Sequence, residues 1–134
     1  MTNKGPALAV DCVVVASSGV VLIKRGHDPF KGCYALPGGF VEVGETVEEA
    51  CKKETFEETG LVLTKLKLIG VYSEPSRDSR RHIVSVAFLG EADISTLCAG
   101  DDASHAEIVR DWRNNTLAFD HKKIISDAHK LNNG

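Results

Sequence analysis

"GFVEVGETVEEACKKETFEETGL", residues Gly39 to Leu61, joins a glycine-rich start to the strongest helix signal in the chain. Thr46 and Glu49 have the spacing of a capping box, in which each side chain bonds the backbone N–H of the other residue. Gly60 suits the left-handed position that follows a helix end. The stretch therefore predicts an α-helix over residues 47–59, preceded by a glycine-rich loop.

Glu54, Glu57 and Glu58 crowd onto one side of this helix. At about 100° per residue, Glu54 and Glu58 continue the stripe begun by Val47 and Cys51, which is the face expected to meet the core. Like charges at this spacing cost about 0.2–0.5 kcal/mol per pair. One interpretation is a helix end in water with solvated acids. The other is a cation site, and oxygen ligands without His or Cys favour Mg²⁺ or Mn²⁺ over Zn²⁺.

The glycines before the helix support the second interpretation. Gly38 and Gly39 permit unusual backbone angles and the close approach of a ligand. A Gly-Gly turn alone is weak evidence and is usually structural. Next to a helix with three clustered acids, it predicts a loop–helix metal platform.

The remaining chain alternates strand signals with turns and ends in a second helix. The apolar patterns predict strands over residues 7–16, 19–25, 61–74 and 82–92, and a short strand over 107–112. Residues 119–132 predict a helix with Asp120 as its N-cap. Strands around a central helix indicate the α+β class rather than a regular βαβ alternation.

Composition limits the class of protein. With 134 residues, one domain over residues 1–134 is expected. The net charge of −3 argues against a nucleic-acid partner, and no apolar run reaches the ~20 residues of a membrane span. None of the four cysteines belongs to a C-x-x-C pair. They are read as reduced thiols of a cytoplasmic protein.

Residues 39–61 resemble the Nudix box, with Lys53 where arginine is usual and Thr55 where an aliphatic residue is usual. Segments outside the box, such as "ALPGGF", "AGDDA" and "LAFDHKKII", resemble the small ADP-ribose pyrophosphatase branch, as does Pro75 about fifteen residues past the box. The signature residues found at the right spacing are Gly39, Glu45, Glu54, Glu57, Glu58, Gly60 and Leu61.

The resemblance implies the Nudix fold, a mixed β-sheet sandwiched between helices with a loop–helix–loop metal site. It also implies Mg²⁺-dependent hydrolysis of a nucleoside diphosphate linked to another moiety, with Mn²⁺ as a substitute. The implied metal ligands are the Gly38 carbonyl, Glu54, Glu57 and Glu58. Lys53 is placed to hold Glu45, although it lacks the bidentate fork of arginine.

Further site residues are candidates on their chemistry. Glu57 is the candidate catalytic group within the box, and Asp102 is the preferred base or extra ligand outside it, against the alternative that Asp101-Asp102 is a plain loop turn. Arginines can bind phosphate groups, although three arginines in a polar loop can also be merely solvated. The candidate substrate-binding residues are Arg25, Gly39, Arg77, Arg80 and Arg81.

The resemblance implies three candidate functions. The first is hydrolysis of ADP-ribose to AMP and ribose 5-phosphate. The second keeps the chemistry but takes an oxidised nucleoside triphosphate, a dinucleoside polyphosphate or a nucleotide sugar. The third is a non-catalytic nucleotide-binding module, which the Lys53 departure favours and the intact acids oppose. In each case the partner is a small-molecule nucleotide, and a homodimer is a candidate assembly because relatives are often dimers.

Overall fold

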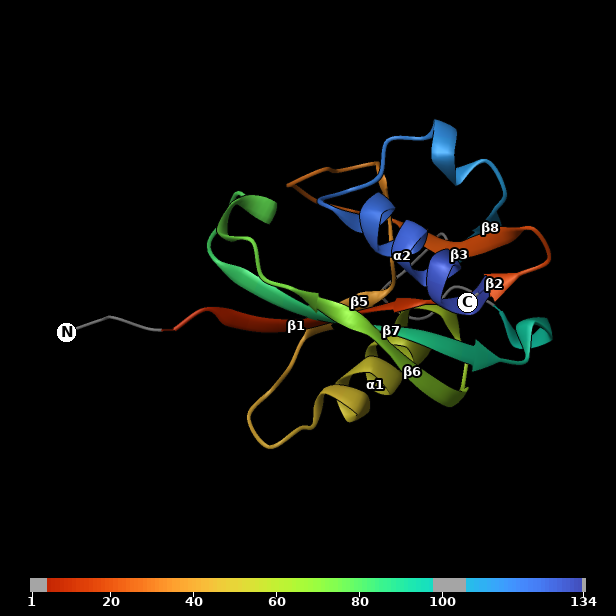
Figure 1. Ribbon diagram of the computed structural model, residues 1–134, viewed down its shortest axis with the longest axis horizontal. Helices are drawn as coiled ribbons and strands as arrows, with labels where there is room; N and C mark the ends of the chain where they lie inside the picture. Colours follow the sequence, from red (N-terminus) through yellow and green to blue (C-terminus); the bar gives the residue numbers. More distant parts are fainter. Residues whose placement is uncertain (1–4, 98–105, 134) are drawn as a thin grey trace.

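The computed structural model describes residues 5–97 and 106–133. These residues form two β-sheets and two α-helices (Figure 1). Short 3₁₀ turns follow β6, β7 and β8. The elements are β1 (Ala7–Val13), β2 (Val15–Ala16), β3 (Gly19–Lys24), β4 (Tyr34–Ala35), β5 (Gly38–Phe40), α1 (Val47–Thr59), β6 (Leu63–Tyr72), β7 (Ile83–Ala92), β8 (Ala106–Val109) and α2 (His121–Asn133).

The first sheet is mixed and carries a helix on each face. Its strand order is β5-β1-β7-β6. β1 and β7 run parallel, whereas β1 pairs with β5 and β6 pairs with β7 in antiparallel fashion. Figure 1 shows α1 on one side of this sheet and α2 on the other. The predicted α+β class, with a mixed sheet between helices, is confirmed.

The second sheet contains β2, β3 and β4, and β8 pairs with β3. The single strand predicted over residues 7–16 is interrupted at Val14, so that β1 belongs to the first sheet and β2 to the second. The strand predicted over residues 107–112 is shorter and begins earlier. It ends at Val109, because Trp112 starts a 3₁₀ turn that buries its indole in the core.

Two cores form on the two faces of the first sheet. Val10 and Cys12 of β1 pack with Ala50 and Cys51 of α1, whereas Val13 packs with residues of α2. Successive side chains of a strand point to opposite faces. Asp11 therefore lies on the face of Val13, where a carboxylate is directed into the α2 side of the structure.

The helix α1 has the predicted limits and caps. Thr46 and Glu49 form the reciprocal capping box, and Gly60 ends the helix with a left-handed φ of 77°. The buried stripe, however, continues through Thr55 and Thr59 and does not turn into carboxylates. Glu54 and Glu58 are half-buried at its border, and Glu57 is exposed. The helix packs against β5, β1 and β6.

Cys12, Cys33 and Cys51 are free thiols, and Cys98 lies outside the described residues. In residues 5–97 and 106–133, neither helix is long and apolar enough to cross a membrane.

The substitution Thr55→Val is expected to stabilise the protein by about 1 kcal/mol. The Thr55 side chain is fully buried, and its hydroxyl has no hydrogen-bond partner among the described residues. An unsatisfied buried hydroxyl costs about 1–3 kcal/mol, and valine has nearly the same shape. Urea unfolding would measure the change in the free energy of unfolding.

Thr59→Val is the matched control for this prediction. The Thr59 hydroxyl donates to the Thr55 carbonyl at 2.6 Å and accepts from the Leu61 N–H at 3.1 Å. Its removal should destabilise the protein by about 1 kcal/mol. Equal effects of the two substitutions, in sign and size, would contradict the assignment.

Candidate active site

A cavity of about 250 Å³ gathers most of the residues that the sequence proposed for a site. Glu54, Glu57 and Arg81 do not line it, and Arg81 is exposed in the loop before β7. Asp102 lies outside the described residues. The predicted site residues in the lining are Arg25, Gly38, Gly39, Glu58, Arg77 and Arg80.

The two glycines let β5 lie tightly between the acids of α1 and the residues of β1. A Cβ atom on Gly39 would come within 2.5 Å of Glu54 Oε1, and one on Gly38 would come within 2.1 Å of the Val10 carbonyl. The Gly38 N–H donates to Glu58 Oε1 at 2.9 Å. The Gly-Gly pair is therefore required by close approach on both faces of the strand.

The surroundings of Glu54 and Glu58 on α1 disfavour their ionised forms in the metal-free protein. Burial raises the pKa of Glu58 to about 8, and the charge of Glu54 adds to the shift although the Gly38 N–H opposes it. Burial also raises the pKa of Glu54, with a further contribution from the charge of Glu57. A nearby cation would reverse both shifts.

This donor set fits a hard divalent cation in its chemistry. It consists of carboxylates on one helix beside the backbone of Gly38, which are the oxygen ligands that Mg²⁺ and Mn²⁺ accept. In the described part of the chain, no three His, Cys, Asp or Glu side chains are already grouped as metal ligands. Glu58 instead bonds to Gly38, and Glu57 is exposed.

Lys53 holds Glu45, as expected from the sequence. Its Nζ lies 2.7 Å from Glu45 Oε2 and 3.8 Å from Glu54 Oε2. Glu45 also accepts from the Glu42 N–H at 2.9 Å. The hydrogen bond from Lys53 and the bond from Glu42 lower the pKa of Glu45. The loop before α1 is thus held to the helix by a lysine where the family usually has arginine.

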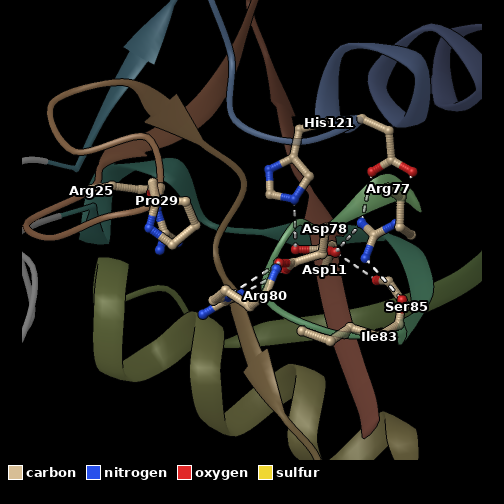
Figure 2. A network of polar contacts seen from close by, with 10 residues as sticks. Asp11, Arg25, Pro29, Arg77, Asp78, Arg80, Ile83, Ser85 and His121 are labelled. Carbon is tan, nitrogen blue, oxygen red and sulfur yellow. Dashed lines mark hydrogen bonds and ion pairs between the residues drawn. The ribbon is translucent and has the colours of Figure 1, made fainter. Parts of the chain in front are cut away.

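Figure 2 shows a polar network in which Ser85, His121 and Arg77 surround Asp11. The Ser85 hydroxyl donates to Asp11 Oδ2, and His121 Nε2 lies 3.3 Å from Asp11 Oδ1. The Leu36 N–H donates to His121 Nδ1 at 3.0 Å. Because Nδ1 accepts, we assign the imidazole proton to Nε2, which faces Asp11.

Burial acts in opposite directions on the two titratable members of this pair. It lowers the pKa of His121 and raises the pKa of Asp11, while their mutual attraction opposes both shifts. The neutral imidazole is therefore the form that suits this position.

Arg77 and Arg80 differ sharply in what they contact. The Arg77 guanidinium donates to both carboxylate oxygens of Asp120, at 2.8 and 2.6 Å, and its side chain is only 5% exposed. Asp120 therefore caps α2 with its backbone carbonyl, which accepts from Ile124, and not with its side chain as predicted. Arg80 pairs with Asp78, and its side chain is 40% exposed.

Sequence reasoning missed several residues of this region. Asp11 and His121 are not among the site residues proposed from the sequence. A carboxylate inside a buried strand needs partners, and that signal could have singled out Asp11. Its partner Ser85 and the Arg80 partner Asp78 had no comparable local signal.

A family model for the NUDIX domain matches residues 5–129. An ADP-ribose pyrophosphatase of Methanocaldococcus jannaschii is 51% identical over 129 residues, which cover 96% of this chain and 76% of that protein. The chain belongs to the Nudix family and is a Nudix hydrolase.

Solved structures show the same fold. The NUDIX domain of Shewanella oneidensis NrtR, crystallised with ADP ribose, superimposes with a TM-score of 0.87 at 26% identity, over 96% of this chain and 90% of that one. A MutT/nudix family protein from Enterococcus faecalis gives a TM-score of 0.86 at 30% identity, over 98% of this chain and 63% of that one. The fold expected from the resemblance is thereby confirmed.

The stability of the metal-free protein is expected to fall between about pH 5 and about pH 8 because of Glu58. Its pKa is about 8 in the folded protein and near 4.5 in the unfolded chain, so the folded state binds the proton more tightly. The contribution of Glu58 to stability is full below the unfolded pKa and is lost as the pH rises through the folded pKa. Melting temperatures in chelator would record this fall.

Glu58→Gln should flatten the fall and raise the melting temperature at pH 8 by at least about 2 °C. Glu48→Gln, in the exposed first turn of α1, should leave the pH profile as it is in the wild type. Parallel profiles for wild type and Glu58→Gln would contradict the raised pKa.

His121→Ala is expected to lower the free energy of unfolding by about 3 kcal/mol. The change leaves the Asp11 carboxylate and the Leu36 N–H buried without their shared partner. His27→Ala, at an exposed position, should change stability by less than about 0.5 kcal/mol. Similar losses in urea unfolding for the two variants would refute a central role of the buried imidazole.

Proposed function

We propose that this protein hydrolyses ADP-ribose to AMP and ribose 5-phosphate with Mg²⁺, for which Mn²⁺ can substitute. The observation that carries the proposal is the placement of β5. It sets Gly38 and Gly39 between the acids of α1 and a cavity that also contains arginines. The similarity to a protein named ADP-ribose pyrophosphatase, over 96% of this chain, supports the choice of substrate.

The residues of the chain have distinct proposed roles. Glu54, Glu57, Glu58 and the Gly38 carbonyl would hold the metal. A bound divalent ion would neutralise the diphosphate and acidify a water molecule. Glu57 is the proposed catalytic carboxylate, because it is exposed and free to accept a proton from the attacking water. Asp102 is proposed as a second base.

The residues proposed to bind phosphate act from different positions. Arg80 and Arg25 line the cavity and present guanidinium groups to a diphosphate. Gly39 offers close backbone approach. Arg77 contributes positive charge from its buried position beside Asp120, and Arg81 is proposed to act from the exposed loop.

A nucleotide panel tests the substrate. We expect no turnover in excess chelator, and with millimolar Mg²⁺ a higher kcat/KM for ADP-ribose than for any nucleoside triphosphate. A triphosphate as the preferred substrate would refute the ADP-ribose assignment, and tight binding without hydrolysis of any nucleotide would indicate a non-catalytic module. Undiminished hydrolysis in chelator would exclude the metal-dependent mechanism.

Glu58→Gln is expected to lower kcat by at least ~100-fold, because a neutral amide cannot hold the cation that stabilises several kcal/mol of developing charge. The fold should persist, since the substitution removes a like-charge contact with Glu54. Steady-state kinetics with ADP-ribose and Mg²⁺ would measure the loss.

Glu48→Gln is the control on the same helix, because Glu48 is exposed and does not line the cavity. Its rate should stay within about twofold of the wild type. Indistinguishable rates for the two variants would show that the acids of α1 do not form the metal site.

A further inference from the structure

The three residues that lead into the glycine pair, Leu36, Pro37 and Gly38, are each anchored by a different element. The Leu36 N–H donates to Nδ1 of His121, the first residue of α2, at 3.0 Å. The Pro37 carbonyl accepts from the Cys12 N–H of β1 at 2.9 Å. The Gly38 N–H bonds to an acid of α1. Residues 36–38 are called the anchored segment below.

The proline in this segment makes the contact at Leu36 important for the residue that follows it. Proline has no N–H, and its ring fixes φ at about −65°. The Leu36 N–H is therefore the last backbone donor before Gly38. Because Pro37 is stiff, a displacement of Leu36 is passed on to the Gly38 carbonyl, which is the oxygen proposed to bind the metal.

The tight packing of Gly38 leaves it little freedom to absorb such a displacement. A Cβ atom at this position would overlap the Val10 carbonyl and come within 2.7 Å of Asp11 Oδ1. Close-packed interiors transmit strain. The direction of the Gly38 carbonyl therefore depends on where the anchored segment is held.

The second nitrogen of the His121 ring keeps the first one in the form that the anchored segment needs. Nε2 lies 3.3 Å from Asp11 Oδ1, and the Ser85 hydroxyl donates to the other oxygen of the same carboxylate (Figure 2). A carboxylate opposite Nε2 retains the ring proton there, which leaves Nδ1 as an acceptor. Nε2 thus orients the ring, and Nδ1 holds the chain.

We propose that His121 is a positioning residue for the divalent cation, because its Nδ1 holds the anchored segment and so sets the direction of the Gly38 carbonyl. The proposal rests on the proposed function for the metal and its ligands. It adds to the determinants of cation affinity a side chain that is 85 residues from Leu36 in the chain. Removing a partner that orients a metal ligand typically costs about 10–100-fold in metal affinity.

The test separates the two ring nitrogens with amide side chains. In His121→Asn, the amide oxygen can replace Nδ1 as the acceptor for Leu36, but the side chain is too short to reach Asp11. In His121→Gln, the amide nitrogen reaches Asp11, and the Leu36 N–H loses its acceptor. Electron paramagnetic resonance of free Mn²⁺, titrated without nucleotide, should show a dissociation constant raised at least about 10-fold in His121→Gln and within about 3-fold of the wild type in His121→Asn.

Ser85→Ala is the control for a general loss of stability. It removes the hydroxyl that donates to Asp11 in the same buried network, and it leaves the contact with Leu36 in place. It should lower the melting temperature and leave the affinity for Mn²⁺ within about twofold of the wild type. Equal affinities in His121→Asn and His121→Gln, or a loss in Ser85→Ala as large as that in His121→Gln, would overturn the proposal.

A measurement on the wild-type protein requires no substitution and decides the question if His121→Gln does not fold. In heteronuclear NMR spectra, titration with Mg²⁺ should shift the His121 Nδ1 and Leu36 amide signals with the same midpoint as the Gly38 amide, because coupling between two sites is reciprocal. His121 and Leu36 signals that stay fixed while the Gly38 signal shifts would overturn the proposal.

These measurements separate the positioning role from the proposed reaction, because Mn²⁺ binding requires no turnover. Selective loss of Mn²⁺ affinity in His121→Gln, in a protein that does not hydrolyse ADP-ribose, would retain the positioning role and refute the reaction. Metal-dependent hydrolysis of ADP-ribose with equal Mn²⁺ affinities in the wild type, His121→Asn and His121→Gln would retain the reaction and refute the positioning role.

Discussion

The His121 imidazole, held between the Asp11 carboxylate and the Leu36 N–H, is the contact on which the site depends. Leu36 precedes Pro37 and Gly38, and Asp11 is paired with Gly38 in the β1–β5 register. One buried ring at the start of α2 therefore fixes the approach to β5 and the strand beside it. Since the Gly38 N–H reaches Glu58, this contact also sets where the glycines meet the helix acids.

The carboxylates near β5, Asp11 and Glu58, differ in the number of hydrogen-bond and ion-pair partners that surround them. This difference distinguishes a carboxylate that stabilises the fold from one suited to binding a ligand. Asp11 is buried, yet it is approached by Ser85, His121 and Arg77. Glu58 is half-buried, and among the described residues its one hydrogen-bond partner is the Gly38 N–H; its pKa is raised to about 8. A protein that needed these acids only for packing would supply them with donors. The sparsely partnered position of Glu58 suits a site that a bound cation would complete.

Local patterns explain how much of this structure the sequence could predict. The limits of α1 follow from the Thr46–Glu49 capping box and Gly60, which act within a few residues, and the Lys53–Glu45 pair lies across the same loop and helix. The strand predictions over residues 19–25 and 82–92 agree with β3 and β7 to within a residue at each end.

The long-range contacts could not be predicted in the same way. Asp11 and Ser85 are 74 residues apart, and Leu36 and His121 are 85 apart. No periodicity in the chain indicates that they meet. The prediction that Glu54 and Glu58 continue the inward face of α1 was wrong for a related reason. Its direction depends on where β5 and the core lie, and Thr55 and Thr59 proved to be the inward residues.

The charges that line the cavity show why arginines alone cannot account for binding of a diphosphate. The lining holds Lys24, Arg25, Arg77 and Arg80 against Asp11, Asp78 and Glu58. Arg80 is already paired with Asp78, and Arg77 with Asp120 outside the lining. Two of the four basic side chains in the lining are thus already paired with carboxylates before any ligand enters. The three arginines after Pro75, which look alike in sequence, are divided by the fold into one buried anchor, one cavity residue and one exposed side chain. A ligand with several negative charges therefore needs positive charge from outside the side chains, and the acids of α1 are placed to recruit it as a divalent cation.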